Sequence, residues 1–386
     1  MADFAGGKIQ AFCGPKEHGA PDNLEEVIVN FIGGARHSLD IAVQEIDSEP
    51  IAQAILDARW RGVRVRIFLE QDYLSSEEPP EPRAKRGEPE SSAVRRAQWS
   101  KGRDSKGTEI NREILTAFLR NAIDVKADYN PKIFHQKFII RDYRGRSKGS
   151  SALLTGSTNF TSTDTHRNLN HIVVFHDPKI CKDYQGEFEE IRSGTFGALR
   201  ERREGKPRTV NLKGVPVRVL FAPDNSPELE IIKQMLKCEK RLDFAIFTFA
   251  GSSGIDDAMV MLRKARRKVR GALDPGQGRQ WWSATDWLHR EGIEVFFPKK
   301  IPPFRKLHHK LMVIDSAIVI AGSMNYTAPA NEYNDENIFV IGSPYPDLPK
   351  REGGPVDLEA CSEIARFFRK EIDRIILRSE RFRPKS

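Results

Sequence analysis

The hydrophobic pattern alternates between two kinds of segment along most of the chain. Short runs rich in aliphatic residues, such as residues 38–43 and 63–69, have the length and composition of buried β-strands. Between them lie stretches with apolar residues three and four positions apart, such as residues 51–58, which predict helices that cover a sheet. Pro50 suits the first turn of that helix and Gly62 suits its end. The alternation predicts an α/β fold.

The same order of strands and helices occurs twice. At 386 residues the chain is longer than a single hydrophobic core usually supports. The pattern therefore predicts two fused repeats of an α/β sandwich, residues 1–200 and 201–386, with mostly parallel sheets flanked by helices. The segments that correspond between the halves are residues 9–12 and 217–221, 23–34 and 227–238, 38–43 and 241–246, and 123–125 and 293–295.

Three segments depart from this repeat. Residues 75–107 are rich in charged residues, Pro, Ser and Gly, which indicates an insertion that cannot order itself by burial. Because it follows a predicted strand, we expect it either near the mouth of the site or as a surface loop without catalytic importance. Residues 194–208 are interpreted as the linker between the halves. The run from Glu363 has an apolar stripe and a basic remainder, which predicts a closing helix packed on the sheet or, alternatively, a helix on a membrane surface.

A set of polar residues interrupts the apolar runs in both halves. Residues 135–142 read His-Gln-Lys-Phe-Ile-Ile-Arg-Asp and residues 308–315 read His-His-Lys-Leu-Met-Val-Ile-Asp. Each motif is followed by Gly-Ser-x-Asn and then by an Asn-x-polar triplet. On a strand, residues two apart face the same side, so the His and Lys of each motif face one way together. Asp142 and Asp315 stand at an odd offset on the opposite face, and we interpret them as capping or turn residues.

This duplicated set resembles the phospholipase D superfamily, whose members cleave phosphodiesters with two such motifs meeting at one site. The resemblance covers nearly the whole chain apart from residues 75–107 and implies an active site at the interface of the halves. It implies that one imidazole attacks phosphorus and forms a phosphohistidine, while the other protonates the leaving oxygen and then activates water. The lysines would neutralise the phosphoryl oxygens. The implied catalytic residues are His135, Lys137, Asn159, His308, Lys310, Asn325 and Glu336, and the implied substrate-binding residues are Ser157, Asn170 and Ser323.

The halves differ at the end of the last triplet, where the first has Asn170 and the second has Glu336. In the family this position commonly orients the histidine of the opposite half, which implies that Glu336 supports His135 and that Asn170 faces His308. A carboxylate stabilises an imidazole as positive charge develops. The asymmetry therefore favours His135 as the nucleophile and His308 as the acid and base. The neighbouring residues His171 and His309 are expected to point away from the site, into packing or surface positions.

No metal-ligand pattern is recognisable, and we expect the chemistry to need no cofactor because lysines and imidazoles supply the charge. The chain has neither a signal peptide nor a run approaching the roughly 18 apolar residues of a membrane span. Its cysteines are far apart, as in reduced thiols. These observations predict a soluble, intracellular, cytoplasmic protein. The cysteines are Cys13, Cys181, Cys238 and Cys361.

The net charge of +8 and the pI of about 9.2 favour a polyanionic partner, either nucleic acid or an anionic membrane, unless the excess charge only aids solubility. Trp281, Trp282 and Trp287 lie beside arginines and either stack on bases or pack in the core. The leading hypothesis is a metal-independent nuclease for DNA or RNA. The alternatives are a phospholipid-hydrolysing or phosphatidyl-transferring enzyme, and a nucleic-acid-binding subunit whose site is silent or depends on a helicase or ATPase partner.

Overall fold

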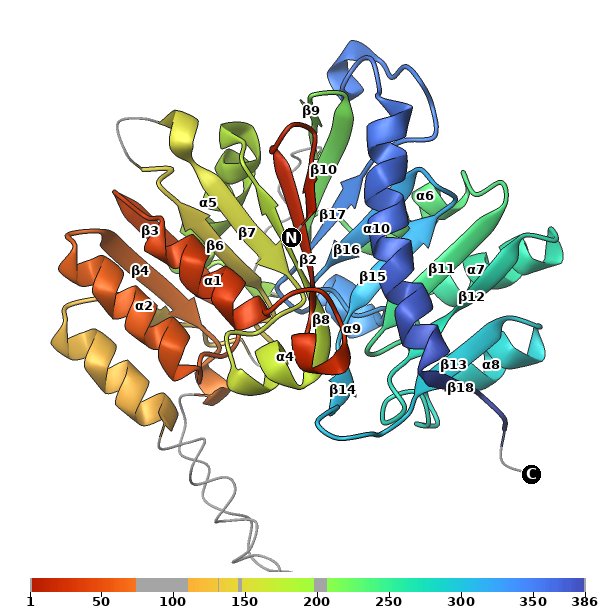
Figure 1. Cartoon of the computed structure of the whole chain (residues 1–386), viewed down its shortest axis with the longest axis horizontal. Helices are drawn as coiled ribbons and strands as arrows, with labels where there is room; N and C mark the ends of the chain where they lie inside the picture. Colours follow the sequence, from red (N-terminus) through yellow and green to blue (C-terminus); the bar gives the residue numbers. More distant parts are fainter. Residues whose placement is uncertain (1, 74–109, 131, 145–147, 198–206, 385–386) are drawn as a thin grey trace, which may run out of the picture.

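A computed structural model describes most of the chain, and its two halves lie side by side (Figure 1). The predicted insertion at residues 75–107 lies outside the described residues, as does the predicted boundary between residues 200 and 201. The described residues are 2–73, 110–130, 132–144, 148–197 and 207–384.

The first half forms a mixed sheet with the strand order β1-β2-β8-β7-β6-β3-β4-β5, and β14 from the second half pairs with β8. Its strands are β1 (Ala2–Phe4), β2 (Ile9–Gly14), β3 (Ser38–Val43), β4 (Arg64–Leu69), β5 (Asp124–Ala127), β6 (Lys137–Arg141), β7 (Ala152–Gly156) and β8 (Asn168–Phe175). Its helices are α1 (Leu24–Gly33), α2 (Glu49–Trp60), a helix over residues 110–120, α4 (Ser162–His166) and α5 (Pro178–Arg192).

The second half repeats this arrangement, with the strand order β18-β13-β12-β11-β15-β16-β17-β10-β9. Its strands are β9 (Thr209–Leu212), β10 (Val215–Ala222), β11 (Arg241–Ile246), β12 (Lys268–Leu273), β13 (Glu294–Pro298), β14 (Lys306–Leu307), β15 (Lys310–Ile314), β16 (Ile318–Gly322), β17 (Glu336–Ile341) and β18 (Ser379–Arg381). Its helices are α6 (Pro227–Met235), α7 (Gly254–Lys264), α8 (Thr285–Arg290), α9 (Ala328–Glu332) and α10 (Leu358–Leu377).

The predicted α/β class with two fused halves is confirmed, but the strand directions need a correction. Parallel pairing within each sheet's main path is confined to β3–β4–β5 and to β11–β12–β13 among the described strands, and the other neighbours are antiparallel. The strands looked parallel because they are nearly continuous apolar runs, a pattern typical of strands buried on both faces. Here antiparallel strands such as β8 are buried throughout as well, because helices and the other half cover the two faces.

Three apolar clusters form the interior. The first packs α1, α2 and the helix over residues 110–120 against the outer face of the first sheet. Another packs α6, α7 and α8 against the outer face of the second sheet. The largest lies between the sheets and includes the apolar faces of α5 and α10. The halves therefore share one core, which holds the two sheets in a defined relation.

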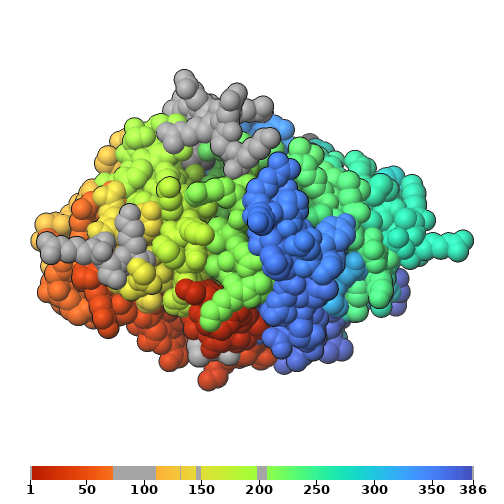
Figure 2. All heavy atoms as spheres, turned by 90° about the horizontal axis from the view of Figure 1, so that it is seen from above, coloured from red at the N-terminus to blue at the C-terminus, as the bar shows by residue number. Residues whose placement is uncertain are grey.

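The C-terminal helix α10 packs on the second sheet and reaches the N-terminal strand β1, with the rings of Phe4 and Phe367 5.9 Å apart between centroids. Figure 2 shows C-terminal residues in blue at the surface beside N-terminal residues in red. The predicted closing helix is thus confirmed as part of the shared core. None of the helices in the described part of the chain is long and apolar enough to cross a membrane.

The aspartates that end the two motifs hold the turns at the far ends of their strands. Asp142 accepts hydrogen bonds from the backbone N–H groups of residues 36–38, and Asp315 accepts them from residues 239–241. Both aspartates have a left-handed backbone, with φ of 58° and 51°. Asp is among the few non-glycine residues that tolerate this region. The prediction that they are structural is confirmed.

Candidate active site

The two His-x-Lys motifs meet where the sheets face each other. His135 immediately precedes β6, which begins at Lys137, and His308 precedes β15, which begins at Lys310. The two imidazoles lie edge to face with ring centroids 6.5 Å apart, and each residue is only 6% exposed. The structure therefore brings together, at one point, residues that are far apart in the sequence.

Backbone hydrogen bonds between the halves fix this meeting point. The N–H of His135 donates to the carbonyl of Asp335 at 3.0 Å, and the N–H of His308 donates to the carbonyl of Leu169 at 2.9 Å. Each histidine is therefore anchored to the middle residue of the opposite triplet. The next residue of each triplet consequently reaches the imidazole of the other half.

Glu336 and Asn170 take the positions that the sequence implied. Glu336 Oε2 lies 2.7 Å from Nδ1 of His135, and Asn170 Oδ1 lies 3.2 Å from Nδ1 of His308. In both imidazoles this leaves Nε2 as the nitrogen available for chemistry. Which ring nitrogen carries the proton follows from the partner of the other nitrogen, and here the acceptors at Nδ1 favour a bare Nε2.

The sequence interpretation missed a second acid at the site. Asp164, on α4, is buried, and its Oδ2 lies 3.4 Å from Nδ1 of His308. The Asp164 carboxylate also accepts the backbone N–H of Asn159 at 2.8 Å and the side-chain amide of Asn168. Alignment of the two halves would have revealed an acid at a position where the second half has Ala330.

The two lysines are buried beside the histidines. Lys137 Nζ donates to the carbonyl of His135 at 2.8 Å and to Oε1 of Gln44 at 3.1 Å. Lys310 Nζ donates to the carbonyl of His308 at 2.8 Å and lies 5.1 Å from the centroid of the Phe247 ring. Neither ammonium forms a direct ion pair within the described residues. Positive charge is thus available at the centre of the site.

Asn159 and Asn325 line the cavity, and the Oδ1 atom of each is buried without a hydrogen-bond partner. Their amides therefore keep hydrogen-bonding capacity for a ligand. Ser157 and Ser323 lie one layer deeper, where their hydroxyls donate to Asn170 Oδ1 at 2.7 Å and to Glu336 Oε2 at 2.6 Å. The serines hold the groups that orient the histidines, and the predicted contact of the serines and Asn170 with substrate stays a prediction.

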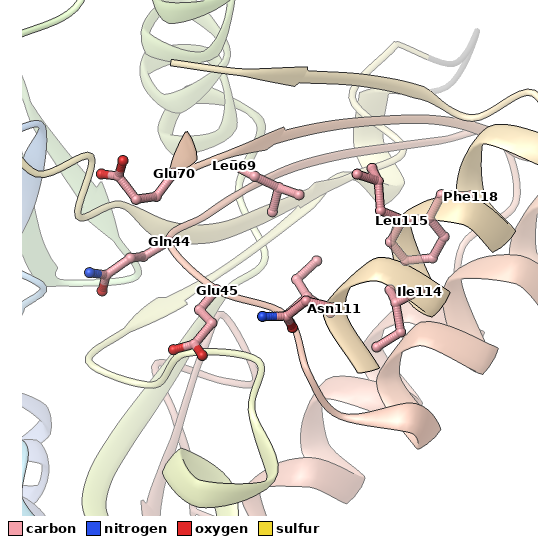
Figure 3. Close-up of a pocket in the computed structure, with 9 residues that line it drawn as sticks. Gln44, Glu45, Leu69, Glu70, Asn111, Ile114, Leu115 and Phe118 are labelled. Atoms are coloured by element: carbon pink, nitrogen blue, oxygen red, sulfur yellow. The ribbon is translucent and has the colours of Figure 1, made fainter. Parts of the chain in front are cut away.

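A cavity of about 610 Å³ opens over the two histidines. Its walls differ between the halves, because Gln44 and Glu45 follow β3 whereas Phe247 and Thr248 follow β11. Gln44 and Glu45 also border a second, small pocket, together with Glu70 and apolar residues of the helix over residues 110–120 (Figure 3). Further out, the cavity is lined from both halves by the cationic side chains of Lys132, Arg305 and Lys306.

Burial sets the protonation behaviour of this site. It lowers the pKa of His308 to about 4 and that of His135 well below its usual value, so both imidazoles are neutral near pH 7. It also lowers the pKa of Lys137 to about 8 and that of Lys310 well below its usual value. Burial raises the pKa of Glu336 to about 8 against the opposing effects of Lys137, the Ser323 hydroxyl and Lys310. The anionic form that accepts the proton on Nδ1 of His135 therefore increases as the pH rises towards 8. Neutral imidazoles are the form that attacks phosphorus or accepts a proton.

The carboxyl of Asp164 behaves differently. Burial alone would raise its pKa, but His308, Asn168 and the N–H of Asn159 bring it below its usual value. Asp164 is therefore an anion beside His308. The anion acts on the imidazole in turn, because it raises the pKa of His308 against the effect of burial.

His171 and His309 do not line the cavity, as predicted. The two residues between each His and Lys, Gln136 and His309, pair across the interface. His309 stacks on His171 with ring centroids 5.3 Å apart, and its Nε2 lies 3.3 Å from Oε1 of Glu371. In the equivalent place of the other motif, Gln136 accepts a hydrogen bond from Asn337 at 2.6 Å. These contacts form a polar floor beneath the catalytic pair.

Two other features of the sequence lie outside the cavity. None of the three tryptophans of residues 281–287 lines it, although Trp281 is 93% exposed. In the described part of the chain, Glu187, Glu190 and Asp224 have carboxylate oxygens within 4.8 Å of one another, close enough to hold a cation. That cluster does not line the cavity, and Glu187 accepts a hydrogen bond from Gln136 at 3.0 Å. The expectation of a cofactor-free reaction stays a prediction.

Residues 28–192 and 231–368 match the family described as "Cardiolipin synthase, PLD-like domain". The chain therefore belongs to the phospholipase D-like family, and the resemblance seen in its motifs is confirmed. The two matched segments coincide with the two halves of the fold.

Curated relatives resemble only part of the chain. It is 25% identical over 171 residues to a mitochondrial cardiolipin hydrolase of Chlamydomonas reinhardtii, covering 44% of this chain and 58% of that protein. It is 27% identical over 164 residues to a phospholipase D of Rickettsia felis, covering 42% of this chain and 62% of that protein. The chain thus spans less than two thirds of the length of these relatives.

Solved structures match the whole fold. Phosphatidylserine synthase of Haemophilus influenzae superposes with a TM-score of 0.58 at 11% identity, covering 99% of this chain and 89% of that one. Polyphosphate kinase of Porphyromonas gingivalis superposes with a TM-score of 0.54 at 11% identity, covering 95% of this chain and 56% of that one. At such identities the likeness concerns the fold alone, so the chemistry rests on the residues of the site.

Proposed function

We propose that this protein is a phosphodiesterase that works through a covalent phosphohistidine. The observation that carries the proposal is the pair of imidazoles of His135 and His308, whose ring centroids lie 6.5 Å apart at one cavity with oxygen atoms of Glu336 and Asn170 at their Nδ1 atoms. Both rings line the same cavity, so a phosphoryl group bound there could reach each imidazole at the roughly 3–3.5 Å that reacting atoms require. The buried ammonium groups of Lys137 and Lys310 would stabilise the charge on its oxygens.

The reaction would proceed in two displacements. Nε2 of His135 attacks phosphorus while the bond to the leaving oxygen breaks. His308 takes up a proton from solvent when the anionic substrate binds beside it and delivers that proton to the leaving oxygen. Neutral His308 then removes a proton from water, which attacks the phosphohistidine and releases His135. The direct contact of Glu336 with His135, at 2.7 Å, supports His135 as the nucleophile. Asp164, an anion next to His308, supports His308 as the group that carries a proton.

We propose a nucleic acid strand as the substrate. Lys132 from the first half and Arg305 and Lys306 from the second line the same cavity as the two histidines. A chain of phosphates that crosses this cavity would meet cations from both halves. The net charge of +8 favours the same class of substrate.

The test is cleavage of labelled single-stranded DNA, double-stranded DNA and RNA by the purified protein. A variant with both His135→Ala and His308→Ala serves as the control for contaminating nucleases. We expect cleavage by the unchanged protein in EDTA, because lysines and imidazoles supply the charge, and a falling rate as salt rises. Loss of all cutting in EDTA that magnesium restores would contradict the metal-free mechanism. Tight binding of DNA without cleavage would favour a silent or partner-dependent subunit.

A phospholipid is the second candidate substrate, and two observations favour it. The relatives named above are a cardiolipin hydrolase and a phospholipase D. In addition, Ile133 and Ile301 are 46% and 61% exposed, and they neighbour Lys132 and Lys300 in the segments that lead into the two motifs. Incubation with vesicles that contain cardiolipin and phosphatidylcholine decides between the classes. Release of phosphatidic acid or headgroup without cleavage of any nucleic acid would overturn the nuclease proposal.

A further inference from the structure

Each half has one acid near the site, but the two acids stand at different positions of the repeat. When the halves are aligned on their Gly-Ser-x-Asn motifs, Asp164 stands where the second half has Ala330, and Asn170 stands where the second half has Glu336. Each half therefore has one carboxylate and one uncharged residue at these two positions, in opposite order. The acid that the first half lacks on β8 is present on the neighbouring helix α4.

The geometry directs this carboxylate at His308. Asp164 Oδ2 lies 3.4 Å from Nδ1 of His308, next to the Oδ1 atom of Asn170 at 3.2 Å. Asp164 is only 4% exposed, and α4 is capped by Thr161, whose side chain accepts the N–H of Asp164 at 3.1 Å. Position and orientation are thus set by the helix cap and not by a flexible surface side chain.

The partners of Asp164 keep it ionised and in place. Its two oxygens accept hydrogen bonds from the backbone N–H of Asn159 and the side chain of Asn168, while its own carbonyl accepts the amide of Asn170 at 3.0 Å. Donors of this kind stabilise a carboxylate. Asp164 is therefore hydrogen-bonded to Asn168 and Asn170, the first and last residues of the triplet whose middle residue binds the backbone of His308.

We propose that Asp164 is the positioning residue of His308, supplying the carboxylate that Glu336 supplies to His135. This inference rests on the proposed phosphodiesterase function and adds to it a separate carboxylate for each imidazole. Asp164 fixes the ring of His308 with Nε2 towards the substrate and stabilises the imidazolium that forms when His308 takes a proton from water. Asn170 shares the contact with Nδ1 but carries no charge.

The first test is Asp164→Asn, which preserves the shape of the side chain. Its turnover of bis(p-nitrophenyl) phosphate should fall roughly 100-fold, the effect typical of acid–base groups. The initial burst of nitrophenol should change little, because nitrophenolate leaves without a proton and attack by His135 does not require Asp164. A general collapse of the site would reduce the burst as well. Full turnover in Asp164→Asn would overturn the proposal.

The second test moves the acid. Asp164→Ala combined with Asn170→Glu gives the first half the arrangement of the second and should recover most of the turnover that Asp164→Ala alone loses. The matched control is Ala330→Asp combined with Glu336→Asn, which gives His135 the arrangement of His308 and should likewise exceed Glu336→Asn alone. If Asn170→Glu restores nothing while the double variant remains folded, Asp164 has a merely structural role.

A third measurement does not depend on activity. The pKa of His308 followed by NMR of labelled histidine should fall by about 1 unit in Asp164→Asn, because an adjacent anion raises it. The other charged groups facing this pair are Lys137 and Lys310, which lower the pKa of His308, and Glu45, which approaches Asp164. If the unchanged protein cleaves no phosphodiester but this shift is observed, the proposed function fails while the positioning role stands. An unchanged pKa would contradict the positioning role.

Discussion

His135 and His308 occupy equivalent positions in the two halves, yet a different element reaches each imidazole. His135 receives Glu336 from the start of β17, whereas His308 receives Asn170 from β8 together with Asp164 from α4. The backbone pairing that brings each triplet to the opposite histidine is the same in both halves. The comparison teaches that the fold fixes the place where support must arrive and leaves the element that supplies it free to change.

The lysines show a second difference between the halves. Lys137 donates to the amide oxygen of Gln44, while Lys310 lies against the ring of Phe247. Gln44 directly follows β3, and Phe247 directly follows the equivalent strand β11. Glu45 follows Gln44, and burial raises its pKa to about 7. The first-half wall therefore offers hydrogen-bond acceptors, and the second-half wall offers an aromatic ring between cations. A substrate would meet different chemistry on its two sides.

The largest expected effect comes from either histidine. His135→Ala and His308→Ala should each lower turnover of a natural phosphodiester by roughly 1,000-fold or more, because each removes a group that forms or breaks a bond. His37→Ala is the matched control, since His37 is exposed and does not line the cavity. Steady-state rates measure the effect. If His37→Ala were as inactive as the other two variants, the loss would not come from removal of a catalytic group.

The next effect separates the supports of the two histidines. Glu336→Gln should lower turnover about 100-fold, whereas Asn170→Ala should lower it only about 10-fold, because Asp164 remains beside His308. Both substitutions remove one contact at Nδ1 of an imidazole. Equal losses in the two variants would contradict a separate role for Asp164.

A pH effect should follow from Lys137. Because burial lowers its pKa to about 8, the side chain is a cation below that pH and becomes neutral above it. An anionic substrate binds the cation better, so KM should rise as the pH passes through about 8. Lys137→Met should show a high KM with a much weaker dependence in this range. A KM that stays flat in the unchanged protein until near the ordinary lysine pKa would contradict this account.

The smallest effect concerns stability. Asp142→Ala and Asp315→Ala should each lower the free energy of unfolding by about 1–3 kcal/mol, because backbone donors lose their acceptor. Asp142→Asn and Asp315→Asn keep one oxygen and tolerate the left-handed backbone, so their losses should be smaller. Urea unfolding measures all four variants. A loss in one half only would show that the equivalence of the two turns is superficial.

Much of the site follows from the duplication in the sequence. The pairing of His135 with Glu336 and the placement of Asn170 near His308 were predicted from the resemblance to the phospholipase D superfamily that the two motifs carry. Asp164 was missed because an acid on a short helix matches no position of the motif, and its meaning appears only when the halves are compared. The stacked pair of His171 and His309 was predicted only to point away from the site. That these two side chains stack on each other depends on how the two sheets pack, and the local hydrophobic pattern does not predict this packing.

The fold was predictable to a similar depth. Apolar runs such as β3 and α2 have the lengths and periods of their elements, and the predicted helices and strands are found there. Strand direction was not predictable from the same runs, because burial on both faces erases the alternation that distinguishes an antiparallel strand. The connection of the two sheets through β14, which pairs with β8, also depends on contacts between distant segments.

The central claim is that His135 forms the covalent intermediate, and the most direct measurement is the mass of quenched protein. His308→Ala lacks the group that activates water, so after reaction with bis(p-nitrophenyl) phosphate it should give one burst of nitrophenol and retain a p-nitrophenyl phosphoryl group on His135. Peptide mass spectrometry locates the adduct. The same adduct on His308 in the His135→Ala protein, with none on His135 in the His308→Ala protein, would contradict the account.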